Sequence, residues 1–137
     1  MRGHVYTVEF RIVSGTLDLA AITSELSLQP CQVWLQGSLR ADGKARPGMW
    51  AYNGFGNDAG KDWDSLERGL DFLLNKLWPH KEAIARYGLN AHLVWWCGHF
   101  QASFDGGPNL SSSMLERLGA FGAELYIDND FSSDGGG

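Results

Sequence analysis

The chain has 137 residues, of which 44% are hydrophobic and 20% charged, an ordinary composition for one soluble globular domain. Its formal net charge of −5 disfavours nucleic acid as a partner, because polyanions repel an acidic protein that has no basic patch. No apolar run approaches the roughly 20 residues of a membrane-spanning helix, and the N-terminus has no apolar signal core, so we expect a cytoplasmic protein. Cys31 and Cys97 are too few for a disulfide framework, and we expect free thiols.

The N-terminal part of the chain predicts a strand followed by a short helix. Residues 4–13 alternate between apolar and polar side chains, as in a strand with one buried face. The apolar face carries Tyr6, Val8, Phe10 and Ile12, and the other face carries Thr7, Glu9 and Arg11. Asp18 is suited to cap the helix that follows, and Pro30 limits its length.

Two more strands are predicted at residues 32–36 and 49–55. Residues 37–48 lie between them and hold glycine, proline and charged residues without an apolar pattern, which is typical of a long hairpin loop. A second loop follows at residues 53–61, with three glycines.

The longest helix is predicted to begin near Asp64 and Glu67, which have the spacing of a capping box. Leucines at helical spacing form its buried stripe: Leu66, Leu70, Leu73, Leu74 and Leu77. Pro79 has no amide proton, so the helix must kink or restart there, and Gly88 ends the helical segment.

The C-terminal part predicts a strand, a helix and a last strand. Residues 91–104 are apolar on both faces, which favours a central strand covered on both sides. Ser113 and Glu116 have the spacing of a second capping box, and Gly122 ends that helix. The tail at residues 132–137 is expected to be disordered.

This order of elements predicts a single α+β domain over residues 1–131. We expect a ferredoxin-like strand-helix-strand-strand-helix-strand sheet with helices on one face, extended by a C-terminal helix and strand.

The order of several short motifs also resembles a known family. They are Phe10-Arg11-Ile12, Leu17-Asp18, Leu28-Gln29-Pro30, Gly48-Met49-Trp50 and the segment from Leu118 to Asp128. In this order they resemble the bacterial domain-of-unknown-function family 4279 over residues 5–131, with Cys31 and Asp130-Phe131 as departures. The resemblance implies no activity. Small bacterial proteins of this kind are sometimes found near toxin genes as candidate immunity proteins, which makes a toxin-neutralising role an expectation by analogy.

The residues that usually carry chemistry do not form a recognisable site. His92 and His99 point to opposite faces of one strand, and Cys97 beside His99 gives only two ligands, so we expect no metal. Asp128 and Asp130 are interpreted as solvated carboxylates of an edge strand. No phosphate-binding glycine motif is present, and Cys97 is interpreted as a buried thiol because His99, two residues on, is too weak a signal of a base. We predict neither a cofactor nor a catalytic residue.

The aromatic residues give the best hypothesis. Trp34, Trp50 and Tyr52 on the second and third strands, with Arg11 on the first, would form a platform on the open side of the sheet. An RNA-binding sheet would need interleaved basic residues, which are absent. We therefore expect a non-enzymatic protein-binding module that uses this platform and the two loops, with its acidic surface selecting a basic partner.

Two alternatives stay open. The first is a small-molecule-binding or hydrolytic enzyme with a pocket around Trp50 and Trp63 and with His99 or Asp128 as its base. The second is a homodimer that buries the aromatic residues between two copies.

Overall fold

The computed structural model describes residues 3–37, 39–45, 47–56, 60–101, 103 and 105–131. In chain order the elements are β1 (His4–Ser14), α1 (Leu19–Leu26), β2 (Gln32–Trp34), β3 (Gly48–Tyr52), α2 (Leu66–Leu77), the 3₁₀ turn η1 (Trp78–His80), α3 (Lys81–Tyr87), β4 (His92–Gln101), α4 (Ser112–Phe121) and β5 (Glu124–Phe131). The predicted tail at 132–137 and part of the predicted loop at 53–61 lie outside the described residues. No helix in the described ranges is long and apolar enough to cross a membrane.

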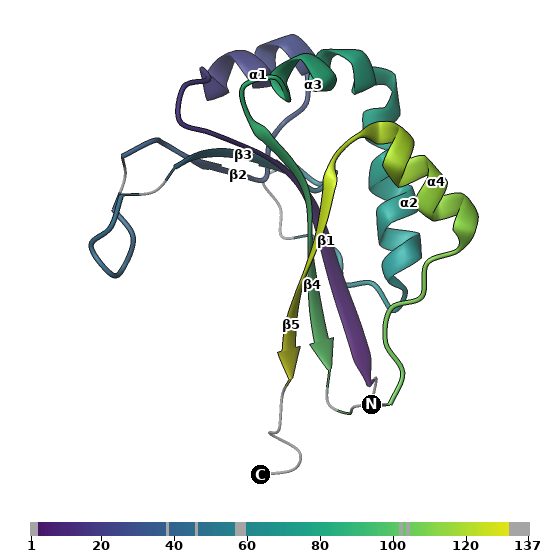
Figure 1. The fold of residues 1–137 in the computed structure, drawn as a ribbon. Coiled ribbons are helices and arrows are strands. Elements are labelled where there is room, and N and C mark those ends of the chain that lie inside the picture. The colour runs from purple at the N-terminus through teal and green to yellow at the C-terminus, as the bar shows by residue number, and fades with distance from the viewer. Residues whose placement is uncertain are drawn as a thin grey trace.

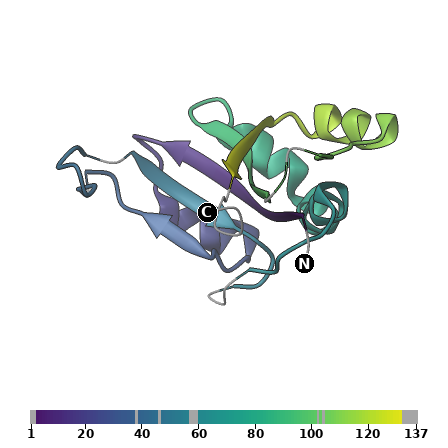
Figure 2. The same cartoon turned by 90° about the horizontal axis from the view of Figure 1, so that it is seen from below.

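The strands form one mixed sheet in the order β2-β3-β1-β4-β5. Neighbouring strands are antiparallel except β4 and β5, which are parallel because α4 carries the chain back between them. The helices lie against one face of this twisted sheet, and Figures 1 and 2 show the other face without a helix over it. The predicted α+β class is therefore confirmed.

The core lies between the sheet and the helices, and the alternation predicted for the first strand is confirmed. The inward side chains of β1 are all buried: Tyr6, Val8, Phe10 and Ile12. The leucine stripe of α2 is also buried, each leucine being at most 1% exposed. Phe10 contacts both Trp95 and Phe121 edge-on, with ring centroids 4.8 and 5.5 Å away, which joins β1, β4 and α4 in one cluster.

The helix starts differ from the predicted capping boxes. Asp18 caps α1 as expected, since its carboxylate accepts from two backbone amides of the first turn. For α2 the cap is Ser65 rather than Asp64, and for α4 it is Ser111 rather than Ser113. Both serines have the extended backbone of an N-cap residue and accept an amide proton three residues on. The two predicted boxes were therefore wrong by one and two residues.

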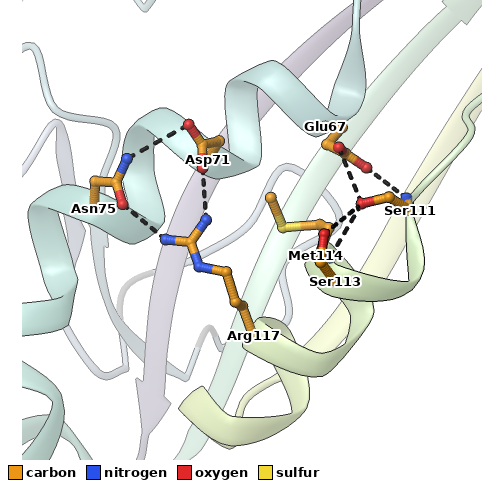
Figure 3. Close-up of polar contacts among 7 residues, drawn as sticks. All are labelled: Glu67, Asp71, Asn75, Ser111, Ser113, Met114 and Arg117. Carbon is orange, nitrogen blue, oxygen red and sulfur yellow. Dashed lines mark hydrogen bonds and ion pairs between the residues drawn. The ribbon is translucent and has the colours of Figure 1, made fainter.

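Glu67 serves the neighbouring helix instead of its own N-terminus. Its carboxylate accepts from the backbone amide and the hydroxyl of Ser111, at the start of α4 (Figure 3). One α-helical turn further along α2, Asp71 accepts from Nη1 of Arg117 at 2.6 Å, and Asn75 accepts from Nη2 at 2.7 Å. These contacts hold α4 against α2 and so set the path of the chain into β5.

The region around Pro79 restarts as predicted. The chain forms η1 at Trp78–His80 and continues as α3, which is capped by Gly88.

The strand predicted at 91–104 is shorter, and the expectation that both its faces are covered is wrong. Because the helices cover one face only, Trp95 is buried and its neighbour Trp96 lies on the other face, only partly covered.

The indole N–H of Trp95 is buried without a hydrogen-bond partner among the described residues, which leads to a testable prediction. Leaving this donor unsatisfied costs about 1–3 kcal/mol. We expect Trp95→Phe to lower the free energy of unfolding by less than about 1 kcal/mol, because removing this N–H offsets part of the lost packing. Trp50→Phe is the matched control and should cost about 1–2 kcal/mol more, since it removes a satisfied N–H. Urea denaturation of both variants measures the difference, and equal costs would contradict the assignment.

Candidate functional site

The sheet face without helices, here called the open face, is defined by alternation and strand register. Arg11 in β1 pairs with Ala51 in β3 and Val94 in β4, and Trp96 pairs with Glu9 in β1 and Tyr126 in β5. Paired residues point to the same side of a sheet. The open face therefore carries Val5, Thr7, Glu9, Arg11, Val13, Gln32, Trp34, Met49, Ala51, His92, Val94, Trp96, Gly98, Phe100, Glu124, Tyr126, Asp128 and Asp130.

Arg11 is at the centre of a group of aromatic rings on this face. Its guanidinium carbon lies 4.1 Å from the ring centroid of Trp96 and 5.7 Å from that of Trp34. Trp96 in turn stacks on Tyr126, with centroids 4.4 Å apart. We call Trp34, Trp96 and Tyr126 around Arg11 the aromatic centre. A cation over tryptophan faces is attracted by the ring quadrupole, which fixes the guanidinium in place.

Glu9 completes the electrostatics of the centre. Arg11 donates from Nε to Oε2 of Glu9 at 2.6 Å, and the two side chains are 16% and 21% exposed. A pair this well covered is screened less by salt than an exposed one. The arginine is therefore held by an ion pair on one side and by aromatic faces on the others.

A pocket of about 760 Å³ opens beside this centre. It lies between the open face and the loop from β2 to β3, where Arg40 and Asp42 form an ion pair at 3.5 Å. Its lining consists of Arg11, Val13, Trp34, Arg40, Ala41, Asp42, Pro47, Met49 and Trp96. We call it the Arg11 pocket. Its volume falls within the range of small-molecule sites, about 300–1,000 Å³.

Of the predicted binding residues, Arg11 and Trp34 are brought together on the open face, but Trp50 and Tyr52 are not. Placing those two on the open face was wrong, because Trp50 pairs with Ile12 and Tyr52 with Phe10 on the buried side. Trp50 is 0% exposed, and its indole Nε1 donates to the hydroxyl of Thr23 at 3.0 Å. It is a core residue.

The sequence of this chain is similar to one family of known proteins. Residues 4–132 match the family model described as Domain of unknown function (DUF4279). The chain belongs to the DUF4279 family. No curated protein and no solved structure matches it. The resemblance drawn from the motif order is confirmed, and because the match runs from β1 through β5, the open face lies wholly inside the DUF4279 domain.

Trp63 lies in a different part of the DUF4279 domain from Trp50. Its backbone exchanges two hydrogen bonds with Tyr6, at 2.7 and 2.8 Å, and its ring packs against Phe72. It lines a separate pocket of about 240 Å³ with charged side chains, among them Lys61, whose Nζ lies 4.5 Å from the indole centroid. Trp50 and Trp63 are therefore not brought together in one pocket.

The two candidate bases are also separated. His99 is 2% exposed on the helix-covered side, where its Nε2 shares a hydrogen bond of 2.8 Å with Nδ1 of His4 and its ring stacks on Tyr6. Its Nδ1 lies 2.7 Å from Asn129, whereas Asp128 points to the open face. Within the described ranges, no group of three or more His, Cys, Asp or Glu side chains is arranged to hold a metal ion.

The sequence missed Trp96 and Tyr126, the two residues that extend the aromatic centre toward β5. Trp96 was hidden because it adjoins the buried Trp95 in a strand that is apolar throughout. The signal that could have found Tyr126 is its alternation with Glu124 and Asp128, which marks a solvent-facing side of the last strand.

The two thiols are free and are expected to be unreactive. Burial raises the pKa of Cys97 to about 12 and that of Cys31 to about 11, and the carboxylate of Glu9 adds to both shifts. At pH 8 both thiols are protonated, and only the thiolate is nucleophilic. We expect iodoacetamide to modify neither cysteine of the folded protein at an appreciable rate and both in urea, read by mass spectrometry. Rapid modification of Cys97 in the folded state would show that it is accessible and ionised.

Proposed function

We propose that this DUF4279 domain is a non-enzymatic binding module of the bacterial cytoplasm that holds a partner protein on its open face. The observation that carries the proposal is the aromatic centre on a face that the helices leave uncovered. Tryptophan, tyrosine and arginine are the residues that most often supply the binding energy of protein interfaces. The centre is accessible to a partner, since Tyr126 is 46% exposed, and Phe100 adds an apolar side chain that is 44% exposed on the same face.

The charges on this face favour a partner with a basic segment. Glu124, Asp128 and Asp130 lie on the open side of β5, next to Tyr126, and the whole chain carries a formal charge of −5. Carboxylates beside aromatic rings suit a lysine or arginine side chain, which gains both Coulombic attraction and a cation–π contact. Arg11 over Trp96 is an internal example of the same contact. A toxin-neutralising role would be the case in which the partner is a basic toxin.

We also propose that the part of the fold from β1 to β4 is a ferredoxin-like unit that serves as the rigid scaffold for this face. Its support is the order β2-β3-β1-β4 with antiparallel neighbours and a helical segment after β1 and after β3. β5 then adds the acidic strip to the edge of that unit.

The test is affinity capture from a lysate of the source cells with tagged wild type and two variants. Trp96→Ala removes the ring at the middle of the aromatic centre, and Leu115→Ala removes an apolar side chain of α4 that is 53% exposed away from the sheet. The proposal expects a protein that is retained by wild type and by Leu115→Ala and lost with Trp96→Ala, and that elutes when salt is raised. If Trp96→Ala still retains that protein, the proposal is contradicted. If the only protein recovered is untagged DUF4279 domain, the open face binds a second copy of this chain instead of a different protein.

A further inference from the structure

We infer that the Arg11 pocket, which shares Arg11, Trp34 and Trp96 with the aromatic centre, binds a small hydrophobic carboxylate. The pocket combines a covered guanidinium with an apolar floor and two tryptophan walls. An apolar cavity with a few well-placed polar groups is the usual make-up of a small-molecule site. Nothing in the protein-binding proposal requires such a cavity, so the two can fail separately.

The guanidinium of Arg11 has donors left for a ligand. Within the described ranges its only hydrogen bond uses Nε, to Glu9, so Nη1 and Nη2 have no partner there. The side chain lines the pocket and is held by Glu9 and the tryptophans, so its orientation is fixed before a ligand arrives. The planar fork of an arginine matches the two oxygens of a carboxylate.

The charge of the lining favours a monoanion over a phosphate. Among the described residues that line the pocket, Arg40 is the other cation, and it is paired with Asp42 at the rim and 54% exposed. Glu9 already offsets part of the charge of Arg11. Within the described lining a dianion would find little positive charge that is not already paired, whereas a carboxylate needs only the unused edge of one guanidinium.

The walls specify the rest of the ligand. Trp34 and Trp96 offer flat apolar surfaces, and Val13, Pro47 and Met49 supply apolar contacts between them and the loop. A flat or compact hydrophobic body removes this surface from water and stacks on the indoles. The ligand class is therefore a monocarboxylate carried on an aromatic or short branched hydrocarbon group.

The experiment titrates purified protein with phenylacetate and with phenylacetamide, its neutral counterpart of nearly the same shape. The indole N–H signals of Trp34 and Trp96 report binding in proton–nitrogen NMR spectra. We expect phenylacetate to shift both signals and to bind at least tenfold more tightly than the amide, because a hydrogen bond to a charged group is stronger than a neutral one. Equal binding of the two probes, or no shift up to millimolar concentrations, would overturn the inference.

Variants then separate a binding role of Arg11 from a structural one. Arg11→Gln should reduce phenylacetate affinity at least tenfold, while Arg68→Gln, on helix α2, should leave it unchanged. If Arg11→Gln binds phenylacetate as tightly as wild type, Arg11 only braces the tryptophans and the inference fails. Should Arg11→Gln not fold, Trp34→Ala takes its place with the same expected loss, and the two-probe comparison on wild type decides the charge requirement alone.

Discussion

Replacing Trp50 with alanine is expected to lower the free energy of unfolding by about 3–5 kcal/mol, the range found for large aromatic residues removed from a packed core. Trp50 is 0% exposed, it stacks on Tyr52 with centroids 6.0 Å apart, and its indole donates to Thr23. Alanine would leave a cavity and an unpaired hydroxyl. Urea denaturation followed by circular dichroism measures the loss, which would be a large part of the total for a domain of this size.

Trp96→Ala is the control for that result. Trp96 is partly exposed on the open face, and among the described residues its ring contacts are with Arg11 and Tyr126. We expect a cost of about 1–2 kcal/mol, the sum of one cation–π contact and one aromatic stack. A cost for Trp96→Ala as large as that for Trp50→Ala would mean that the open face is part of the core. Because Trp50 is a core residue, loss of binding in Trp50→Ala would report unfolding. Trp96→Ala is therefore the informative variant for partner binding.

Gly69→Leu is expected to destabilise the domain by about 2–3 kcal/mol, because α2 crosses β1 at this glycine without room for a side chain. A Cβ atom at position 69 would lie 2.8 Å from Cγ2 of Val8 and 3.0 Å from Cδ1 of Trp63. Neither neighbour can withdraw easily, since Val8 is buried and the backbone of Trp63 is paired with Tyr6. Thermal and urea denaturation measure the change.

Gly119→Ala in α4 provides the opposite expectation in the same protein. A Cβ atom there meets nothing within 4 Å, so the substitution should raise the free energy of unfolding by about 0.5–1 kcal/mol through helix propensity alone. If Gly69→Ala stabilised the domain as much as Gly119→Ala does, the claim that α2 approaches β1 too closely for a side chain at position 69 would be contradicted.

Local patterns were enough to predict most of the fold. The alternation of β1, the leucine stripe of α2 and the break at Pro79 each depend on neighbours along the chain, and each is confirmed. Helix starts were less predictable, because Asp64, Ser65, Ser111 and Ser113 are all acceptable caps by type. Only the extended backbone of the two capping serines decides between them.

The candidate site could be predicted only in part, because it depends on which sheet face the helices cover. Every residue of β3 is buried, so its sequence does not show that Trp50 faces the helices and Met49 faces the open side of the sheet. Trp95 and Trp96 are adjacent and identical in type, yet strand alternation sends them to opposite faces. The Arg11 pocket also requires the loop after β2 to fold back near the sheet, which no local pattern encodes.

Site-specific photocrosslinking in the source cells tests the open face as a binding surface most directly. Benzoylphenylalanine would replace Tyr126 on the open face in one variant and Leu115 on α4 in another; the two side chains are similarly exposed, at 46% and 53%. The binding proposal predicts a crosslinked partner from position 126 and none from position 115. Crosslinking from position 115 alone, or from neither position, would contradict it.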